Sequence, residues 1–221
     1  RYTSLANNAR IQLNLEREDR EDPKQYIIWY TTNYGNLFES SPILPDYVML
    51  KWREHAKRHG FKIPGEVGIL VSVARVLIDA IQHQYSKILI LEDDVIFHKK
   101  GHQLFSQQVS QLPSWKLLYL GCSMHRWRYR ERCRKFTHYW VPKGTIAGAF
   151  ALGIDQSVYS ILLQAVRTLQ SPWDQAPLKL INTKFPGQCL VLRPHFAIAE
   201  TTSSDIRDSK SMSTKSGDCG W

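Results

Sequence analysis

The stretch Lys87–Phe97 reads KILILEDDVIF, and it decides the fold class. After Lys87, the residues Ile88–Leu91 form an apolar run with the length of a buried strand. Glu92, Asp93 and Asp94 then interrupt the run, although adjacent carboxylates repel one another and lose much stabilisation when they leave water. The three carboxylates at the end of this strand must therefore lie where water or a positive charge compensates their negative charge.

Strand-like and helix-like patterns alternate on both sides of this stretch. Runs of apolar residues bounded by Gly or Pro predict strands, and apolar residues at helical spacing predict helices. This alternation is typical of one α/β domain in which helices flank a largely parallel sheet. The predicted strands are 25–30, 87–91, 115–121, 144–154, 188–194 and 195–200, and the predicted helices are 46–60, 67–84 and 155–169.

The chain has 221 residues and is predicted to be one domain. Residues 1–24 form a charged N-terminal segment, and the Ser-, Lys- and Gly-rich residues 201–221 are predicted to be a mobile tail. No apolar run approaches the roughly 20 residues that cross a bilayer, and no secretory signal is visible. We therefore expect a cytoplasmic location. Peripheral attachment to a membrane, or a lumenal location, stays open because the sequence begins with Arg1 rather than Met.

The formal net charge of +9 concerns partners rather than the fold. Phosphates, acidic glycans and an anionic membrane surface all fit this charge. Nucleic acid is not a predicted partner, because the sequence has no zinc-finger spacing, helix-turn-helix signal or RNA-binding aromatic signature. The four cysteines have no C-x-x-C pairing, which argues against a structural zinc and leaves both free thiols and disulfides open.

The three acids are explained best by a bound cation. In an open α/β sheet, ligands bind beyond the carboxyl ends of the strands, which is where Glu92, Asp93 and Asp94 stand. Carboxylate oxygens suit Mn²⁺ or Mg²⁺, and these ions commonly also hold substrate phosphates. The alternative is an exposed acidic turn after a strand. The residue chemistry favours a metal that bridges these carboxylates and a diphosphate.

A series of motifs resembles glycosyltransferase family 25, which includes lipopolysaccharide and procollagen galactosyltransferases. The family's opening strand has two candidates, NLEREDR and QYIIWYTTNYG. The resemblance covers about residues 64–207, and its motifs stand in the family's order. These motifs are GEVG leading into LEDD (65–94), LLYLG (117–121), GAFALGIDQSVYSILL (148–163), SPWDQAPL (171–178) and RPHFAIAETTSSDIR (193–207).

The resemblance implies a glycosyltransferase A fold, which is Rossmann-like. It also implies a nucleotide-sugar donor, UDP-linked, with Mn²⁺ or Mg²⁺ and inversion at the sugar. Glu92 and Asp94 would bind the metal, and Asp93 would contribute to the diphosphate side of the same acidic motif. His195 would be a further metal ligand; its alternative is a partly buried structural histidine.

The remaining motifs imply further contacts with the two substrates. Asp174, in the Pro-x-Asp element, would be the base that takes the proton of the acceptor hydroxyl; its alternative is an N-cap for the segment that follows. Glu66 would lie on the donor side, or would simply favour the dipole of a helix that starts there. Ser204 and Asp205 would order over the bound donor, or form an ordinary polar turn.

An arginine-rich stretch, SMHRWRYRERCRKF (123–136), alternates basic and other residues with a period of two. Arg126 and Arg128 are predicted to pair with phosphate or with an acidic acceptor, while Trp127 stacks on a sugar ring. The alternative is a solvated edge hairpin whose charges keep the sheet edge from aggregating.

The predicted function is a metal-dependent transfer of a hexose, galactose or glucose, from a UDP-sugar to a glycan, glycoprotein or glycolipid hydroxyl. Two alternatives belong to other classes: a non-catalytic glycan-binding or adhesion module, and a nucleotidyltransferase-like enzyme. The second is disfavoured because no Gly-rich phosphate loop follows the first strand.

Overall fold

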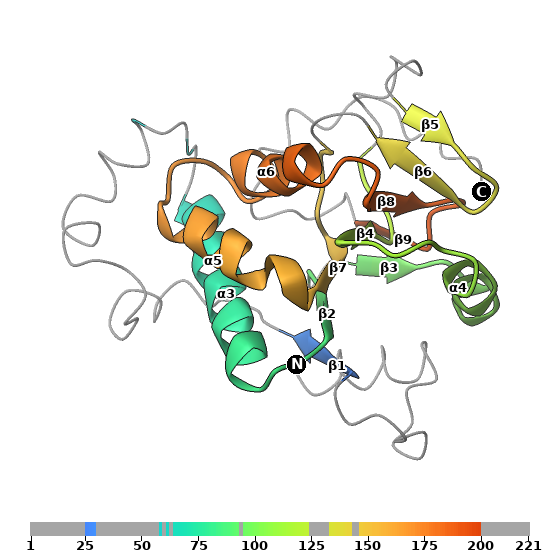
Figure 1. The fold of residues 1–221 in the computed structure, drawn as a ribbon, viewed down its shortest axis with the longest axis horizontal. Helices are drawn as coiled ribbons and strands as arrows, with labels where there is room; N and C mark the ends of the chain where they lie inside the picture. The colour runs from blue at the N-terminus through green and yellow to red at the C-terminus, as the bar shows by residue number, and fades with distance from the viewer. Residues whose placement is uncertain are drawn as a thin grey trace.

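The structure is a computed structural model that describes residues 25–29, 58, 61, 64–92, 95–123, 133–142 and 146–199. The predicted helix at 46–60 lies outside these ranges except for Arg58. Within them the chain forms a mixed α/β fold built on one central sheet (Figure 1). No helix of the described part is long and apolar enough to cross a membrane.

The central sheet has seven strands in the described residues, and β1 and β5 are its two edges. The predicted strand at 87–91 is confirmed as β2, and its neighbours lie far away in sequence. In spatial order the strands are β1 (Gln25–Trp29), β2 (Lys87–Leu91), β7 (Ala151–Asp155), β4 (Leu117–Tyr119), β8 (Cys189–Leu192), β6 (Tyr139–Pro142) and β5 (Cys133–Lys135).

Strand direction in this sheet is mixed. The pairs β1–β2 and β4–β8 are parallel, and the pairs β2–β7, β7–β4, β8–β6 and β6–β5 are antiparallel. Taken along the order, β1, β2, β4, β8 and β5 point one way, and β7 and β6 point the other. Most strands therefore point the same way, as the predicted largely parallel sheet requires. Most neighbouring pairs are nevertheless antiparallel, because β7 and β6 stand between strands of the other direction.

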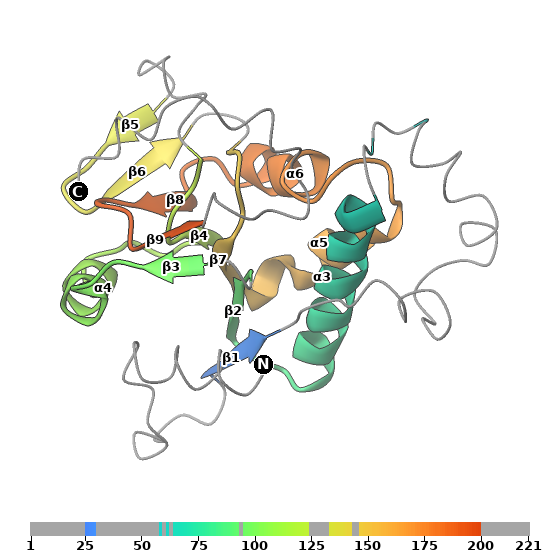
Figure 2. The ribbon, with the colours of Figure 1, turned by 180° about the vertical axis from the view of Figure 1, so that it is seen from behind.

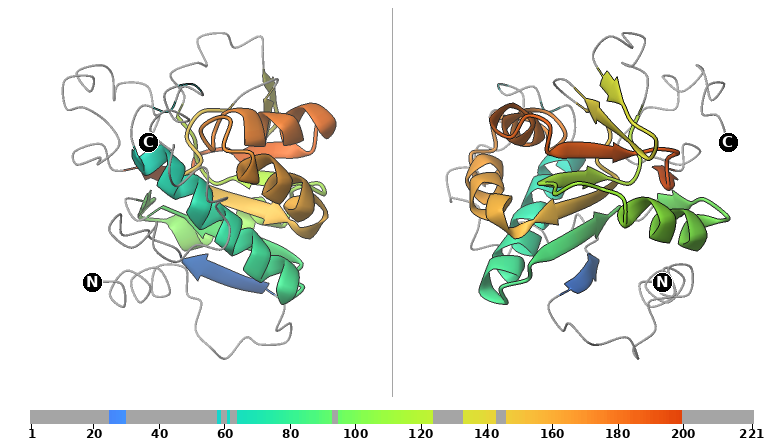
Figure 3. Two further views of the ribbon diagram at one scale, coloured as in Figure 1. Left: turned by 90° about the vertical axis from the view of Figure 1, so that its left-hand side faces the viewer. Right: turned by 45° about the vertical axis from the view of Figure 1, so that its right-hand side comes forward.

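Helices cover both faces of the sheet (Figures 2 and 3). On one face α3 (Pro64–Gln82) packs against α5 (Tyr159–Arg167), and α5 packs against α6 (Ala176–Lys184). On the other face lie α4 (Gly101–Val109) and a second, two-stranded sheet of β3 (Val95–Phe97) and β9 (Ala197–Ala199). Each face has its own apolar core.

The two cores explain why the residues after Lys87 in β2, Ile88–Leu91, are all apolar. Ile88 and Ile90 belong to the core under α3, α5 and α6, whereas Leu91 belongs to the core on the opposite face. A strand that is covered on both sides lacks the polar alternation of a half-exposed strand. The helix α3 confirms the predicted helix at 67–84, and it begins earlier because Pro64 suits the first helical turn.

Two predicted elements have different bounds in the structure. The strand predicted at 144–154 is regular only from Ala151, because Gly148 has a φ of +79° and Ala147 makes only an isolated bridge with Ser123. The helix predicted at 155–169 begins with a 3₁₀ turn, η4 (Gln156–Val158), before α5. Asp155 is the N-cap of that turn and accepts a hydrogen bond from the Ser157 backbone, as its position at the start of the pattern predicts.

The two sheets meet where the chain after β8 crosses the end of β4. The backbone N–H groups of Phe196 and Ala197 both donate to the Leu120 carbonyl, at 2.7 and 3.3 Å. Gly121 lies directly under this crossing: a Cβ atom built on it would stand 1.8 Å from the Ala197 carbonyl oxygen. No side chain fits there, since the obstructing atom is backbone and belongs to a residue whose N–H is hydrogen-bonded to Leu120.

We predict that Gly121→Ala destabilises the protein by about 3 kcal/mol or more, because overpacking against fixed backbone is the severe form of this change. Urea unfolding measured by circular dichroism checks this. Gly153→Ala is the matched control, since its Cβ would meet the end of the Trp115 ring at 3.2 Å and that ring can shift. Equal losses in the two variants would contradict the prediction.

Candidate functional site

The carboxyl ends of four strands meet at one edge of the central sheet. β1, β2, β4 and β8 run in the same direction, so Trp29, Leu91, Tyr119 and Leu192 all stand at this edge. The chain enters β7 from the same edge at Ala151, which pairs with Leu91. This carboxyl edge is where ligands bind in open α/β sheets, and it receives four of the predicted site residues.

Glu92 lies at the carboxyl edge as predicted. Its backbone N–H donates to the Phe150 carbonyl at 2.8 Å, which extends the β2–β7 pairing by one residue. Its own carbonyl accepts from the Val95 N–H at 3.4 Å, across Asp93 and Asp94. Glu92 is half-buried, so its carboxylate stands between the apolar core and the surface.

The acidic motif is also tied to the last described strand. β3 begins at Val95, directly after Asp94, and Val95 pairs with Ala199 of β9. The chain therefore leaves β9 next to the acidic motif, and the segment that carries Ser204 and Asp205 follows in sequence. The stretch 87–97 is thus two strands in two sheets, with the acids at the junction.

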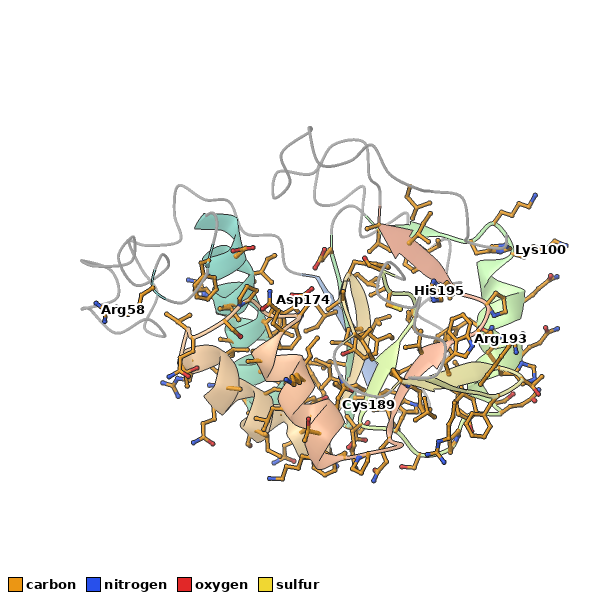
Figure 4. All side chains as sticks on the ribbon, turned by 90° about the horizontal axis from the view of Figure 1, so that it is seen from above. Arg58, Lys100, Asp174, Cys189, Arg193 and His195 are labelled. Atoms are coloured by element: carbon orange, nitrogen blue, oxygen red, sulfur yellow. The ribbon has the colours of Figure 1, made fainter. Side chains whose placement is uncertain are left out.

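Asp174 turns its carboxylate toward the same edge. Its Oδ2 accepts a hydrogen bond from the Gly148 backbone N–H at 3.3 Å. The interpretation of Asp174 as a helix cap is wrong, because the N-cap of α6 is Gln175, and it is the Ser171 Oγ that accepts from the Ala176 N–H in the first turn, at 3.1 Å. Since Gly148 stands just before β7, this contact fixes the loop that precedes α6 against the carboxyl edge. Figure 4 shows Asp174 on this loop.

His195 follows β8 and lies at the same edge, in the segment that crosses β4 (Figure 4). Its Nε2 stands 3.9 Å from the Cys122 Sγ, and its ring meets the Trp140 ring edge-on at a centroid distance of 5.5 Å. Burial lowers the pKa of His195 to about 4, so the imidazole is neutral at pH 7. These contacts are those of a partly buried structural histidine, although a neutral imidazole is also the form that binds metals.

Glu66 stands in the first turn of α3 and is half-buried. The helix packs along the sheet and ends just before β2 begins, so its N-terminus lies toward the carboxyl edge (Figure 3). Both interpretations of Glu66 fit this place, because an acidic side chain is favourable near a helix N-terminus whether or not a ligand is present.

The other predicted site residues lie outside the described ranges and stay predictions: Asp93, Asp94, Arg126, Arg128, Ser204 and Asp205. Among the described residues, no group of three or more His, Cys, Asp and Glu side chains is placed to hold a metal ion. A divalent cation at this edge would therefore need Asp93 or Asp94 beside Glu92. The donor set fits Mn²⁺ or Mg²⁺, since it consists of hard carboxylate oxygens.

Tyr119 and Asn182 form a buried polar pair that was not predicted from the sequence. The Tyr119 hydroxyl and both polar atoms of the Asn182 side chain are buried without a hydrogen-bond partner among the described residues. Burial raises the pKa of Tyr119 well above its usual range, and Cys189 raises it further, while the nearby Asn182 amide lowers it. The amide is thus close enough to act on Tyr119, but the geometry gives no direct hydrogen bond between them. Asn182 stands on the buried face of α6, one turn after Leu178, and that break in the apolar pattern was the available signal.

No protein-family model matches this chain, and no curated protein sequence matches it. The resemblance to glycosyltransferase family 25 therefore stays a prediction.

The solved structures that are similar to the chain include two transferases. One is a glycosyltransferase involved in the glycosylation of the major capsid of PBCV-1, with a TM-score of 0.42 and 11% identity over 81% of this chain and 93% of that chain. The other is mannose-1-phosphate geranyltransferase from Thermus thermophilus, with a TM-score of 0.34 and 9% identity over 76% of this chain and 73% of that chain. At these scores the two likenesses carry no argument, and the α/β fold rests on the strands and helices described above.

We predict that His195→Gln removes a pH dependence of stability. The folded-state pKa of His195 is about 4, whereas an unfolded histidine titrates near 6.5, so the unfolded state takes up a proton first. The wild type should lose on the order of 3 kcal/mol from this source as the pH falls from about 6.5 to about 4. The difference in the free energy of unfolding between the wild type and His195→Gln should therefore become smaller over that pH range. Urea unfolding of both proteins at pH 7, 5.5 and 4.5 measures this difference. A constant gap would mean that the pKa of His195 is not lowered.

Tyr119→Phe should leave the stability unchanged or raise it by up to about 1 kcal/mol, because the substitution removes a buried hydroxyl without a partner and keeps the ring. Tyr159→Phe is the matched control: the Tyr159 hydroxyl donates to the Ile154 carbonyl, so its loss should cost about 1 kcal/mol. Urea unfolding at pH 7 compares the two. A Tyr119→Phe variant that is the less stable of the pair would show that an ordered water bridges the hydroxyl to Asn182.

Proposed function

We propose that this protein is a metal-dependent glycosyltransferase that moves galactose or glucose from a UDP-sugar to a hydroxyl of a glycan or of a glycosylated protein or lipid. The observation that carries the proposal is the placement of Asp174. Its carboxylate accepts from the Gly148 backbone N–H at the carboxyl edge, where β2 ends at Leu91 and Glu92 follows. A base and an acidic motif that come from distant parts of the chain thus share one ligand-binding edge.

The hydrogen bond from Gly148 gives Asp174 its orientation. Because Oδ2 is fixed by a backbone N–H, rotation of the carboxylate is restricted and Oδ1 remains the oxygen that can accept a proton. In the proposed reaction Asp174 takes the proton of the acceptor hydroxyl while that oxygen attacks the anomeric carbon in line with the leaving diphosphate. One base and one displacement account for the inversion that we propose.

Glu92 and Asp94 are the proposed metal ligands, with Asp93 on the diphosphate side. A bound divalent cation would supply Lewis-acid stabilisation of the departing diphosphate. His195 is a less favoured ligand, because its ring is in contact with Cys122 and Trp140. Within the glycosyltransferases we propose the family 25 type, supported by the ordered motifs between residues 64 and 207.

The test measures the shift in melting temperature that UDP-galactose and UDP-glucose produce with Mn²⁺ and with EDTA. The wild type should show a shift that needs the metal, and Asp94→Asn should lose it. Asp174→Asn should keep the shift but lose transfer by about 10²–10⁴-fold, because it removes only the base.

Asp79→Asn is the matched control for both variants. Asp79 is a carboxylate near the far end of α3, paired with His83, so both the shift and the transfer should survive this substitution. Absence of a metal-dependent shift with every UDP- and GDP-hexose would overturn the proposal. Loss of donor binding in Asp174→Asn would remove Asp174 from the role of base.

A further inference from the structure

The hairpin of β5 and β6 presents cations and aromatic rings at the surface. Arg134, Lys135 and Phe136 are exposed, and the Phe136 ring stacks on Tyr139 with a centroid distance of 4.6 Å and an interplanar angle of 13°. Arg193 joins them from the end of β8, where its Nη1 donates to the Phe136 carbonyl at 3.1 Å. We call Arg134, Lys135, Phe136, His138, Tyr139 and Arg193 the hairpin patch.

No acidic side chain of the described residues belongs to this patch. Asp79 is paired with His83 and Asp155 with Lys116, on other elements. The three remaining described acids, Glu66, Glu92 and Asp174, belong to the candidate site. The positive charge of the hairpin patch is therefore not neutralised from within the described fold, and it is complementary to an anion.

The hairpin patch is placed in line with the candidate site. Tyr139 pairs with Leu192, and the Arg193 N–H donates to the His138 carbonyl at 2.9 Å, so the hairpin turn stands at the carboxyl end of β8. The strand order from β2 to β6 has four steps, β2–β7–β4–β8–β6. At about 4.8 Å a step, the patch lies about 19 Å along the same edge from the acidic motif.

We propose that the hairpin patch binds the anionic oligosaccharide part of the acceptor, several sugar units away from the hydroxyl that reacts at Asp174. This inference rests on the proposed function. Guanidinium and ammonium groups pair with the carboxylates or phosphates of such a chain, and the exposed face of Phe136 offers apolar area to the C–H face of a sugar ring. A single neutral sugar would reach only one end of this edge.

An anionic glycan is the proposed ligand because the hairpin patch combines aromatic rings with positive charge. Stable binding to a lipid surface takes an apolar anchor in addition to positive charge, whereas Phe136 is packed flat against Tyr139 and does not project as an anchor. Trp140, the next residue of β6, meets His195 at the candidate site, which makes the hairpin continuous with that site.

The test measures the Kd of a fluorescent galacturonic acid hexamer by anisotropy, with no donor or metal present. The fully methyl-esterified hexamer has the same length without the charge, and it should bind at least tenfold more weakly. The double variant Arg134→Ala/Lys135→Ala should weaken hexamer binding at least tenfold, and Phe136→Ala should weaken it about fivefold.

Two controls lie on α6, away from the hairpin. Lys179→Ala/Lys184→Ala removes the same net charge from exposed positions, and Leu180→Ala removes an exposed apolar side chain that matches Phe136. Both should keep the hexamer Kd within twofold. Equal weakening in the hairpin and α6 variants would overturn the inference, because binding would then follow net charge alone.

Other outcomes separate this inference from the proposed function. If the hexamer binds through the hairpin patch but no nucleotide-sugar binds, the proposed transfer function is overturned and the patch remains a glycan-binding surface. Donor binding without hexamer binding would overturn the inference alone. Binding to phosphatidylglycerol vesicles through the same residues, without hexamer binding, would replace the glycan by a membrane and would also overturn it.

Discussion

The close contact between Gly121 and the Ala197 carbonyl is the constraint on which the rest of the arrangement depends. It allows the chain after β8 to cross the end of β4 instead of leaving the sheet. Because of this crossing, His195 reaches Cys122 and β9 reaches β3, which follows the acidic motif. A larger residue at position 121 would separate the two sheets, and the acids after β2 would lose the strand beside them.

The fold separates stability from chemistry. Both apolar cores lie along the lengths of the strands, and few polar side chains are buried among the described residues. Tyr119, Asn182 and Gln108 are the exceptions, since each has a buried polar atom without a hydrogen-bond partner there. The carboxyl edge collects the ends of four strands, where backbone groups such as the Gly148 N–H remain free to hold a side chain. Substitutions of the Glu92 and Asp174 carboxylates at this edge should therefore alter ligand binding more than folding.

Sequence patterns predicted the parts of the structure that depend on local periodicity. The helix α3 and the strand β2 were predicted because their apolar residues are covered continuously, and Asp155 marked the start of the turn before α5. The separation of β3 from β2 was not predicted, because it is defined by pairing with Ala197–Ala199, far along the chain. The partner of Asp174 was missed for the same reason: Gly148 looked like part of a strand, whereas it has a positive φ and its N–H donates to a carboxylate 26 residues further along the chain.

The pairing of β3 with β9 also has a consequence for the order of assembly. β3 is made before its partner β9, which is the last strand of the described chain, so Val95 cannot pair with Ala199 until β9 has been made. Contacts between such distant residues form late, because the loop between them must close first. A growing chain can build α3 and pair β1 with β2 while the acidic motif still has no second sheet beside it. The candidate site thus becomes complete only when the C-terminal part has folded back, which keeps a partly made chain from presenting a finished binding edge.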